Sequence, residues 1–102
     1  MYSARDQVEN EEWLAELDRA SSRLDVSRQV VSRAGDLFLT HLPDEERSKR
    51  AVLAASLYVA TLTESERRSQ GDVAEAMEVS RLTIQQRWKE ILDSTGLEPP
   101  SW

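Results

Sequence analysis

The 102-residue sequence is poor in several residue types, and each scarcity limits what the protein can be. It contains no cysteine, which excludes disulfide bonds, thiolate zinc sites and thiol nucleophiles. Its one histidine, His41, argues against a histidine-based metal site. Three glycines and three prolines leave little room for turn-rich β architecture. These absences favour a helical domain without a metal or cofactor.

No long hydrophobic run is present either. The longest mostly apolar stretch covers residues 51–62 and contains Ser56 and Thr61, whereas a membrane-spanning helix needs about 20 apolar residues. The first residues, Met-Tyr-Ser-Ala-Arg-Asp-Gln, lack the apolar core of a signal peptide. We therefore expect a cytoplasmic protein that does not enter a membrane.

Lysine is scarce and negative charge is in excess. The chain has 19 acidic and 13 basic side chains, a net charge of −6, and its lysines are Lys49 and Lys89 alone. Residues 1–46 hold 11 acids and five bases, and residues 47–102 hold eight of each, so the whole excess lies in the first part. This composition is typical of a protein in concentrated salt, with an ordinary acidic surface as the alternative. At first sight it argues against nucleic-acid binding.

Apolar residues recur at helical spacing nearly everywhere, and no segment of any length alternates with period two. The third predicted helix is apolar around nearly its whole circumference, which predicts the central helix of the domain. We expect an all-α, five-helix domain over residues 10–94, with flexible ends at 1–9 and 95–102. The predicted helices cover residues 10–24, 28–41, 46–62, 70–77 and 81–93.

Local signals mark where these helices begin and end. Gly96, followed by Pro99 and Pro100, lies just past the last helix. Gly35 lies inside the second helix, where glycine costs about 1 kcal/mol relative to alanine, so we expect a close approach of another helix to compensate. The residues placed to cap helix starts are Asn10, Ser27, Ser69 and Ser80.

Residues 69–93 have the pattern of a helix-turn-helix, in which a short helix and a tight turn precede a helix that enters the major groove. Ile84, Trp88 and Ile91 share its inward face. The exposed face then offers arginine for guanine and glutamine for adenine, and residues 81–89 carry three bases and no acid. The candidate base-reading residues are Arg81, Leu82, Gln85 and Gln86. The candidate phosphate-binding residues are Arg67, Arg68, Arg87 and Lys89.

The alternative interpretation of this motif is an ordinary solvated helix face. Glutamine and arginine are common on such faces, and helix-turn-helix geometry occurs in proteins that bind no DNA.

Two longer segments make the pattern more specific. Residues 47–60, Arg-Ser-Lys-Arg-Ala-Val-Leu-Ala-Ala-Ser-Leu-Tyr-Val-Ala, form a small-residue central helix that ends in Leu-Tyr-x-Ala. Residues 72–91 continue through Asp-Val-Ala, Val-Ser and Thr-Ile-Gln-Gln-Arg-Trp-Lys-Glu-Ile. Over residues 11–93 the chain resembles the cyclin-like repeat of transcription factor IIB, with Trp88 in place of a tyrosine.

The resemblance implies a five-helix cyclin-like fold and a single DNA- or protein-docking module. In that family the second repeat reads a promoter element with its helix-turn-helix, and the two repeats embrace the TATA-binding protein. The family occurs in archaea, and the acidic, lysine-poor composition fits a halophilic archaeon. This chain departs from the general factor because it has no cysteines for a zinc ribbon, one repeat instead of two, and an acidic balance.

The remaining conspicuous residues have simpler interpretations. His41 lies near a helix end, where a cation suits the helix dipole. The carboxylates of Glu9, Glu11, Glu12 and Glu16 favour a solvated helix start over a cation site. Trp13 is expected in the core, and Trp102 in a frayed terminus, with a small docking anchor as its alternative.

The function that these observations predict is a small DNA-binding transcription regulator related to transcription initiation factor IIB. The alternative is a protein-interaction module that docks on the TATA-binding protein or another transcription factor through the first helix and the acidic part of the chain. No nucleophile–base set and no glycine-rich phosphate loop is present. We therefore expect no enzyme activity, catalytic residue, cofactor, metal site or small-molecule substrate.

Overall fold

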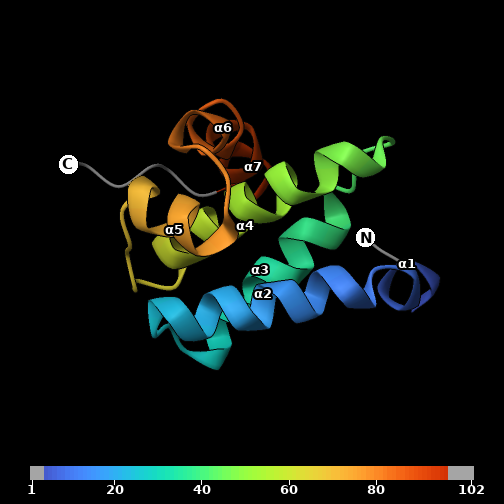
Figure 1. The fold of residues 1–102 in the computed structure, drawn as a ribbon, viewed down its shortest axis with the longest axis horizontal. Helices are drawn as coiled ribbons and strands as arrows, with labels where there is room; N and C mark the ends of the chain where they lie inside the picture. The colour runs from blue at the N-terminus through green and yellow to red at the C-terminus, as the bar shows by residue number, and fades with distance from the viewer. Residues whose placement is uncertain (1–3, 97–102) are drawn as a thin grey trace.

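The computed structural model describes residues 4–96, apart from the side chain of Gln7, and this part of the chain is all helical (Figure 1). The all-α class predicted from the sequence is confirmed. Residues 97–102, including Trp102, lie outside the described residues. The elements are α1 (Ala4–Glu9), α2 (Glu11–Leu24), α3 (Arg28–Thr40), the 3-10 turn η1 (Glu46–Ser48), α4 (Lys49–Thr63), α5 (Gln70–Met77), α6 (Arg81–Gln85) and α7 (Trp88–Ser94).

Helix α4 is the centre of the fold, as its composition predicts. Every residue from Val52 to Leu62 is buried, and α2, α3, α5, α6 and α7 all pack against this helix. Figure 1 shows α4 crossing the middle of the molecule, with α2 on one side of it and α6 and α7 on the other. Ala54, Ala55 and Ala60 are fully buried and let the neighbouring backbones come close. Helix α4 therefore fixes where the last two helices lie.

Helices α2 and α3 form a layer against α4, through the apolar stripes that helical spacing predicts. Leu17 from α2 and Phe38 from α3 are fully buried. A close approach at Gly35 is not required, because a Cβ there would lie 3.7 Å from Leu14 Cδ2 and 3.8 Å from Leu17 Cδ2, which are ordinary contact distances. The prediction that helix packing compensates for this glycine is therefore wrong.

The start of the chain differs from the prediction. Residues Ala4–Glu9 form helix α1, where we expected a flexible end. Asn10 stands before α2, but its side chain does not cap that helix. The side chain is buried: its Nδ2 donates to the Asp6 carbonyl at 2.7 Å, and its Oδ1 accepts from Lys49 Nζ at 2.8 Å. Asn10 thus links α1 to the start of α4. Its side-chain amide is used in these two hydrogen bonds and does not cap α2.

The three serine caps are confirmed. The hydroxyl of each serine accepts a hydrogen bond from the backbone N–H three residues later: Ser27 from Val30 at 3.4 Å, Ser69 from Asp72 at 3.0 Å, and Ser80 from Thr83 at 3.2 Å. Gly96 adopts φ +76° just past α7, as expected of a residue that ends a helix.

Candidate nucleic-acid interface

Helices α5 and α6 are joined by the tight turn that the sequence predicts. Glu78 ends α5 with φ 59° and ψ 44°, a left-handed conformation, and the Val79 N–H donates to the Ala74 carbonyl at 3.0 Å. Ser80 then opens α6 with its side-chain cap. The unit packs on α4 through Val73, Met77 and Ile84, which are all buried. The helix-turn-helix therefore has a rigid base.

The helix predicted over 81–93 is broken in two. Helix α6 ends at Gln85 and α7 begins at Trp88. At the break the backbone has a hydrogen bond of the 3-10 type: the Arg87 N–H donates to the Ile84 carbonyl, three residues back, at 3.0 Å. Ile84, Trp88 and Ile91 still face inward and are at most 5% exposed. The Trp88 ring meets Tyr58 edge-on, with centroids 5.5 Å apart. Apolar spacing alone misses the break, because the inward positions keep a helical period across it.

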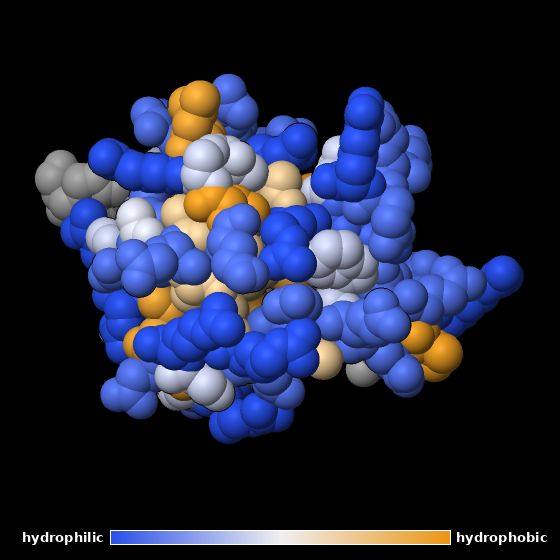
Figure 2. All heavy atoms as spheres, in the orientation of Figure 1, coloured by the Kyte–Doolittle hydropathy of each residue, from blue (hydrophilic) through white to orange (hydrophobic). Residues whose placement is uncertain are grey.

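The predicted base-reading side chains lie on the outside of this unit. Arg81, Leu82, Gln85 and Gln86 are all exposed. Leu82 is 59% exposed, which is unusual for a large apolar side chain. Figure 2 shows a mostly hydrophilic face with an apolar spot over α6, the helix that carries Leu82, and another over α1, the helix that carries Val8. The placement fits base contact, and the base-reading role remains a prediction.

The predicted phosphate-binding residues do not form one group. Arg67 and Arg81 line the same pocket, of about 460 Å³, beside the start of α5. Lys89 is near it, with its Nζ 5.8 Å from the centre of the Trp88 ring, which also lines the pocket. Arg87 lines a different pocket, of about 220 Å³, with His41 and Glu90. Arg87 therefore lines a different pocket from Arg67.

Arg68 has a structural position. Its guanidinium donates to the Leu24 carbonyl at 3.0 Å and the Asp25 carbonyl at 3.1 Å, at the end of α2, and to the carbonyls of Glu66 and Arg67. Four of its five N–H groups are thus engaged. The pocket beside it, about 460 Å³, also includes Asp72 and Glu75. These contacts do not favour a phosphate role for Arg68, because backbone carbonyls already accept hydrogen bonds from most of its guanidinium N–H groups.

Two further arginines hold the end of α5, and the sequence analysis missed both. Arg23 donates to the Ala76 carbonyl at 3.1 Å, and Arg50 donates to the Met77 carbonyl at 3.0 Å. Cations at a helix C-terminus satisfy its last carbonyls and oppose its dipole. The contacts span 53 and 27 residues of sequence, so no local pattern could have revealed them.

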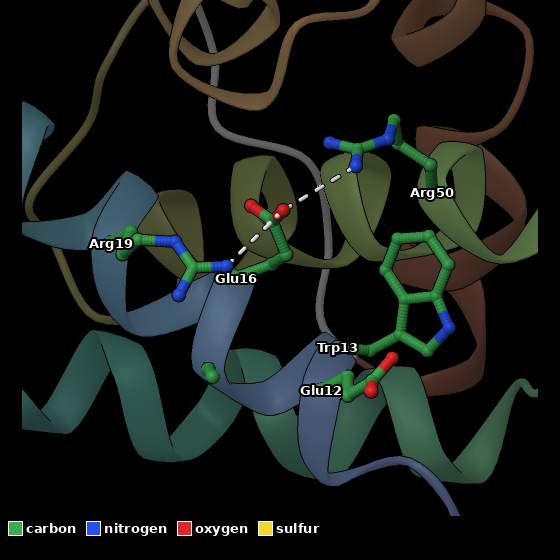
Figure 3. A pocket seen from close by; sticks show the side chains of 6 residues that line it. Glu12, Trp13, Glu16, Arg19 and Arg50 are labelled. Atoms are coloured by element: carbon green, nitrogen blue, oxygen red, sulfur yellow. Dashed lines mark hydrogen bonds and ion pairs between the residues drawn. The ribbon is translucent and has the colours of Figure 1, made fainter.

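A second polar hollow lies between α2 and α4, where Trp13 was predicted in the core. Trp13 is only partly buried, and it lines a pocket of about 310 Å³ with Glu12, Glu16, Arg19 and Arg50. Figure 3 shows Glu16 between the two arginines, at 3.2 Å from Arg19 and 3.5 Å from Arg50. The Arg50 guanidinium lies 5.2 Å from the centre of the Trp13 ring. Burial opposes ionisation of Glu16, but the two arginines together hold the pKa of its carboxyl below the ordinary value.

Residues 4–96 contain no group of three or more histidine, aspartate or glutamate side chains arranged to hold a metal ion. His41 ends α3, and its Nδ1 lies 2.8 Å from the Leu37 carbonyl, so the ring engages the helix terminus. Within the same part of the chain, no helix is long and apolar enough to cross a membrane.

The fold defines a class: a helical repeat with an alanine-rich central helix and a helix-turn-helix at its end. The sequence profile described as the transcription factor TFIIB repeat matches residues 9–94. The chain therefore belongs to this family of transcription-factor repeats, and the resemblance inferred from residues 47–60 and 72–91 is confirmed. A comparison with curated proteins finds no match. An archaeal or halophilic origin stays a prediction.

Proposed function

We propose that this repeat is a small transcription regulator that binds duplex DNA with α6 in the major groove. The observation that carries the proposal is the exposed, acid-free face of the helix-turn-helix: no carboxylate occurs from residue 79 to residue 89, in a chain of net charge −6. Membership of the TFIIB-repeat family supports a role in transcription.

The chemistry of that face suits base edges. Gln85 and Gln86 can each pair with adenine through two hydrogen bonds, and the exposed Leu82 can contact a thymine methyl group. The N-terminal residues of a recognition helix contact the bases, and α6 has only five residues before the break. The short helix predicts a short site, and the glutamine and leucine contacts predict that it contains A·T pairs.

The acidic part of the chain does not prevent this binding. The excess charge lies in residues 1–46, and Figure 1 shows α2 and α6 on opposite sides of α4. The acid excess weakens attraction to DNA phosphates in general. We therefore expect base contacts, or a bound partner protein, to supply much of the specific affinity.

The test is a fluorescence anisotropy titration with a duplex selected by the wild type from a random library. A bidentate glutamine–adenine pair is worth about 1–3 kcal/mol, so Gln85→Ala should weaken binding about tenfold and relax the preference at one base pair. Gln29→Ala, the same change on the exposed part of α3, is the matched control and should leave binding unchanged. No selected sequence, or equal binding by Gln85→Ala and wild type, would overturn the proposal.

A second candidate function is protein docking, and the pocket beside Trp13 is the observation that favours it. This hollow lies on the acidic side of the molecule and offers an indole ring together with carboxylates and arginines (Figure 3). The partner would be the TATA-binding protein or another transcription factor. Loss of partner binding in Trp13→Ala, with Gln85→Ala unaffected, would favour docking over DNA recognition.

A further inference from the structure

We propose that Arg23 and Arg50 are positioning residues for DNA recognition, because they hold the end of α5 and thereby fix the direction in which α6 is presented to the major groove. This inference rests on the proposed DNA binding. Neither arginine belongs to the helix-turn-helix: Arg23 lies in the last turn of α2, and Arg50 lies in the first turn of α4. Both act on DNA recognition through α5, without a contact to the duplex.

The end of α5 is the point from which α6 takes its direction. Only residues 78–80 separate Met77, the last residue of α5, from the first residue of α6. Glu78 has the left-handed conformation, φ 59° and ψ 44°, and the Val79 N–H donates to the Ala74 carbonyl. Because this connection is short and hydrogen-bonded back to α5, a movement of the end of α5 moves α6 with it.

The two arginines supply hydrogen bonds that the end of α5 cannot make within the helix, since the last four carbonyls of an α-helix have no helical partner. Arg23 Nη1 donates to the Ala76 carbonyl at 3.1 Å, and Arg50 Nη1 donates to the Met77 carbonyl at 3.0 Å. Ala76 and Met77 are both buried. Hydrogen bonds from a charged donor are stronger than those between neutral groups. Separate contacts therefore attach the end of α5 to α2 and to α4.

The Arg50 guanidinium is itself oriented by α2. Its Nη2 lies 3.5 Å from Glu16 Oε1, and its Cζ lies 5.2 Å from the centre of the Trp13 ring. Figure 3 shows the guanidinium directed toward Glu16, with Trp13 beside it. The side chains of Arg50 and Glu16 are 34% and 33% exposed, and an ion pair with this exposure contributes little to folding stability. Together with the ring, it limits the directions from which Arg50 can reach the Met77 carbonyl.

The two arginines lie away from the proposed DNA-binding face. Arg23 belongs to α2, and Arg50 lines the pocket beside Trp13, also on α2. Figure 1 shows α2 and α6 on opposite sides of α4. Removal of either arginine should therefore change how α6 meets the base edges, which carry the sequence information, and should not remove a phosphate contact.

The first test compares Arg50→Met with Arg19→Met. Methionine keeps an unbranched apolar side chain and removes the guanidinium donors. Arg19 is the matched control: it lines the same pocket and lies 3.2 Å from the same carboxylate, Glu16, but makes no hydrogen bond to α5 among residues 4–96. Both variants lose one positive charge, so any general weakening of attraction to DNA is shared by the two.

Anisotropy titrations would measure affinity for the selected duplex and for a duplex of the same composition in permuted order, at a temperature at which circular dichroism shows both variants folded. Loss of one bidentate base contact corresponds to about tenfold in affinity. Arg50→Met should lower the ratio of the two affinities about tenfold relative to Arg19→Met, at the same salt slope for the permuted duplex. Equal ratios, or a lower salt slope in Arg50→Met alone, would overturn the proposal.

Arg23→Met repeats the test on the other contact. Arg23 does not line the pocket beside Trp13, so this variant leaves the Trp13, Glu16 and Arg50 cluster in place and serves if Arg50→Met does not fold. It removes the hydrogen bond to the Ala76 carbonyl and should lower the same affinity ratio. A ratio equal to that of Arg19→Met would contradict the positioning role of Arg23.

A measurement without DNA separates this inference from the proposed function. Residual dipolar couplings of the ¹⁵N-labelled chain report the direction of each N–H bond relative to the rest of the molecule. Fitted to the alignment of α3 and α4, the couplings of Arg81–Gln85 should deviate in Arg50→Met and agree with wild type in Arg19→Met. Deviation in a protein whose wild type selects no duplex would support the positioning of α6 and overturn the proposed function. Couplings and discrimination that both stay unchanged in Arg50→Met would overturn the positioning role alone.

Discussion

Single side chains stabilise this repeat through local contacts and through contacts with residues far away in the sequence. The serine caps act locally, three residues from their partners, and the sequence reveals them for that reason. Arg23, Arg50 and Arg68 act at long range, on carbonyls 27 to 53 residues away. In the sequence these arginines cannot be told from other exposed basic residues, so the carbonyl contacts of Arg68 were not foreseen and its phosphate role stays a prediction. Residue-scale prediction succeeds where the partner is a neighbour in the chain.

Gly35 offers a direct test at this scale. A methyl group would make ordinary contacts with Leu14 and Leu17, and the helical backbone does not require glycine. Gly35→Ala should therefore raise the free energy of unfolding by about 0.5–1 kcal/mol. Urea denaturation followed by circular dichroism measures this. A destabilised variant would mean that α2 and α3 pack more tightly at this point than the contacts indicate.

At the scale of elements, one loop connects the two halves of the fold. The loop after α4 sends Glu66 to the start of α3, where its carboxylate accepts from the Ser27 N–H at 2.9 Å and from the Ser27 hydroxyl. Arg68, two residues on, covers the end of α2. An anion at one helix start and a cation at the other helix end both match the helix dipoles. The α2–α3 turn is thereby held beside the entry to the helix-turn-helix.

The pH dependence of stability tests this arrangement. The hydrogen bonds from the Ser27 hydroxyl and backbone lower the pKa of the Glu66 carboxyl from its ordinary value. A lowered folded-state pKa gives stability that is present above the unfolded-state pKa of about 4.3 and is lost as pH falls through the folded-state pKa. Glu66→Gln should thus melt below wild type at pH 7, and the difference should shrink towards pH 3. Parallel melting curves at all pH values would show that the charge of Glu66 has no role.

Much of the element order follows from the sequence, but not the break between α6 and α7. The caps and the apolar circumference of residues 51–62 predict the starts of α3, α5 and α6 and the central place of α4. At the break the Arg87 N–H donates to the carbonyl three residues back instead of four, and the Trp88 ring packs on Tyr58, 30 positions away; the apolar spacing indicates neither. Helix α1 was missed because Asn10 looks like a cap, whereas burial gives its side chain partners in Asp6 and Lys49.

At the scale of the whole molecule, negative charge is distributed unevenly. The acid excess lies in residues 1–46, and the acid-free span 79–89 crosses α6 on the opposite side of α4. Helix α2, which carries four of the eleven acids in residues 1–46, lies on the opposite side of α4 from α6 (Figure 1). The net charge of −6 therefore does not describe the surface of α6, which the sequence predicts by residue number and the fold by position.

Salt should stabilise the folded repeat. Glu11 and Glu12 are exposed on α2 and make no ion pair within residues 4–96. Screening of like charges by 1 M KCl, if it removes about 1 kcal/mol of repulsion, raises the melting temperature by about 4–8 °C. Replacing both residues by glutamine should reduce this rise. A melting temperature that falls with salt would contradict both this account and the expected adaptation to concentrated salt.

The most direct test of the central claim is to map the DNA contact on the folded protein. Amide resonances of the ¹⁵N-labelled chain would be recorded with and without the selected duplex. The account predicts shifts concentrated at the start of α5 and along Arg81–Gln86, with the resonances of Trp13 and its neighbours on α2 unchanged. Shifts that cluster on α2, or no shifts at any salt concentration, would contradict it.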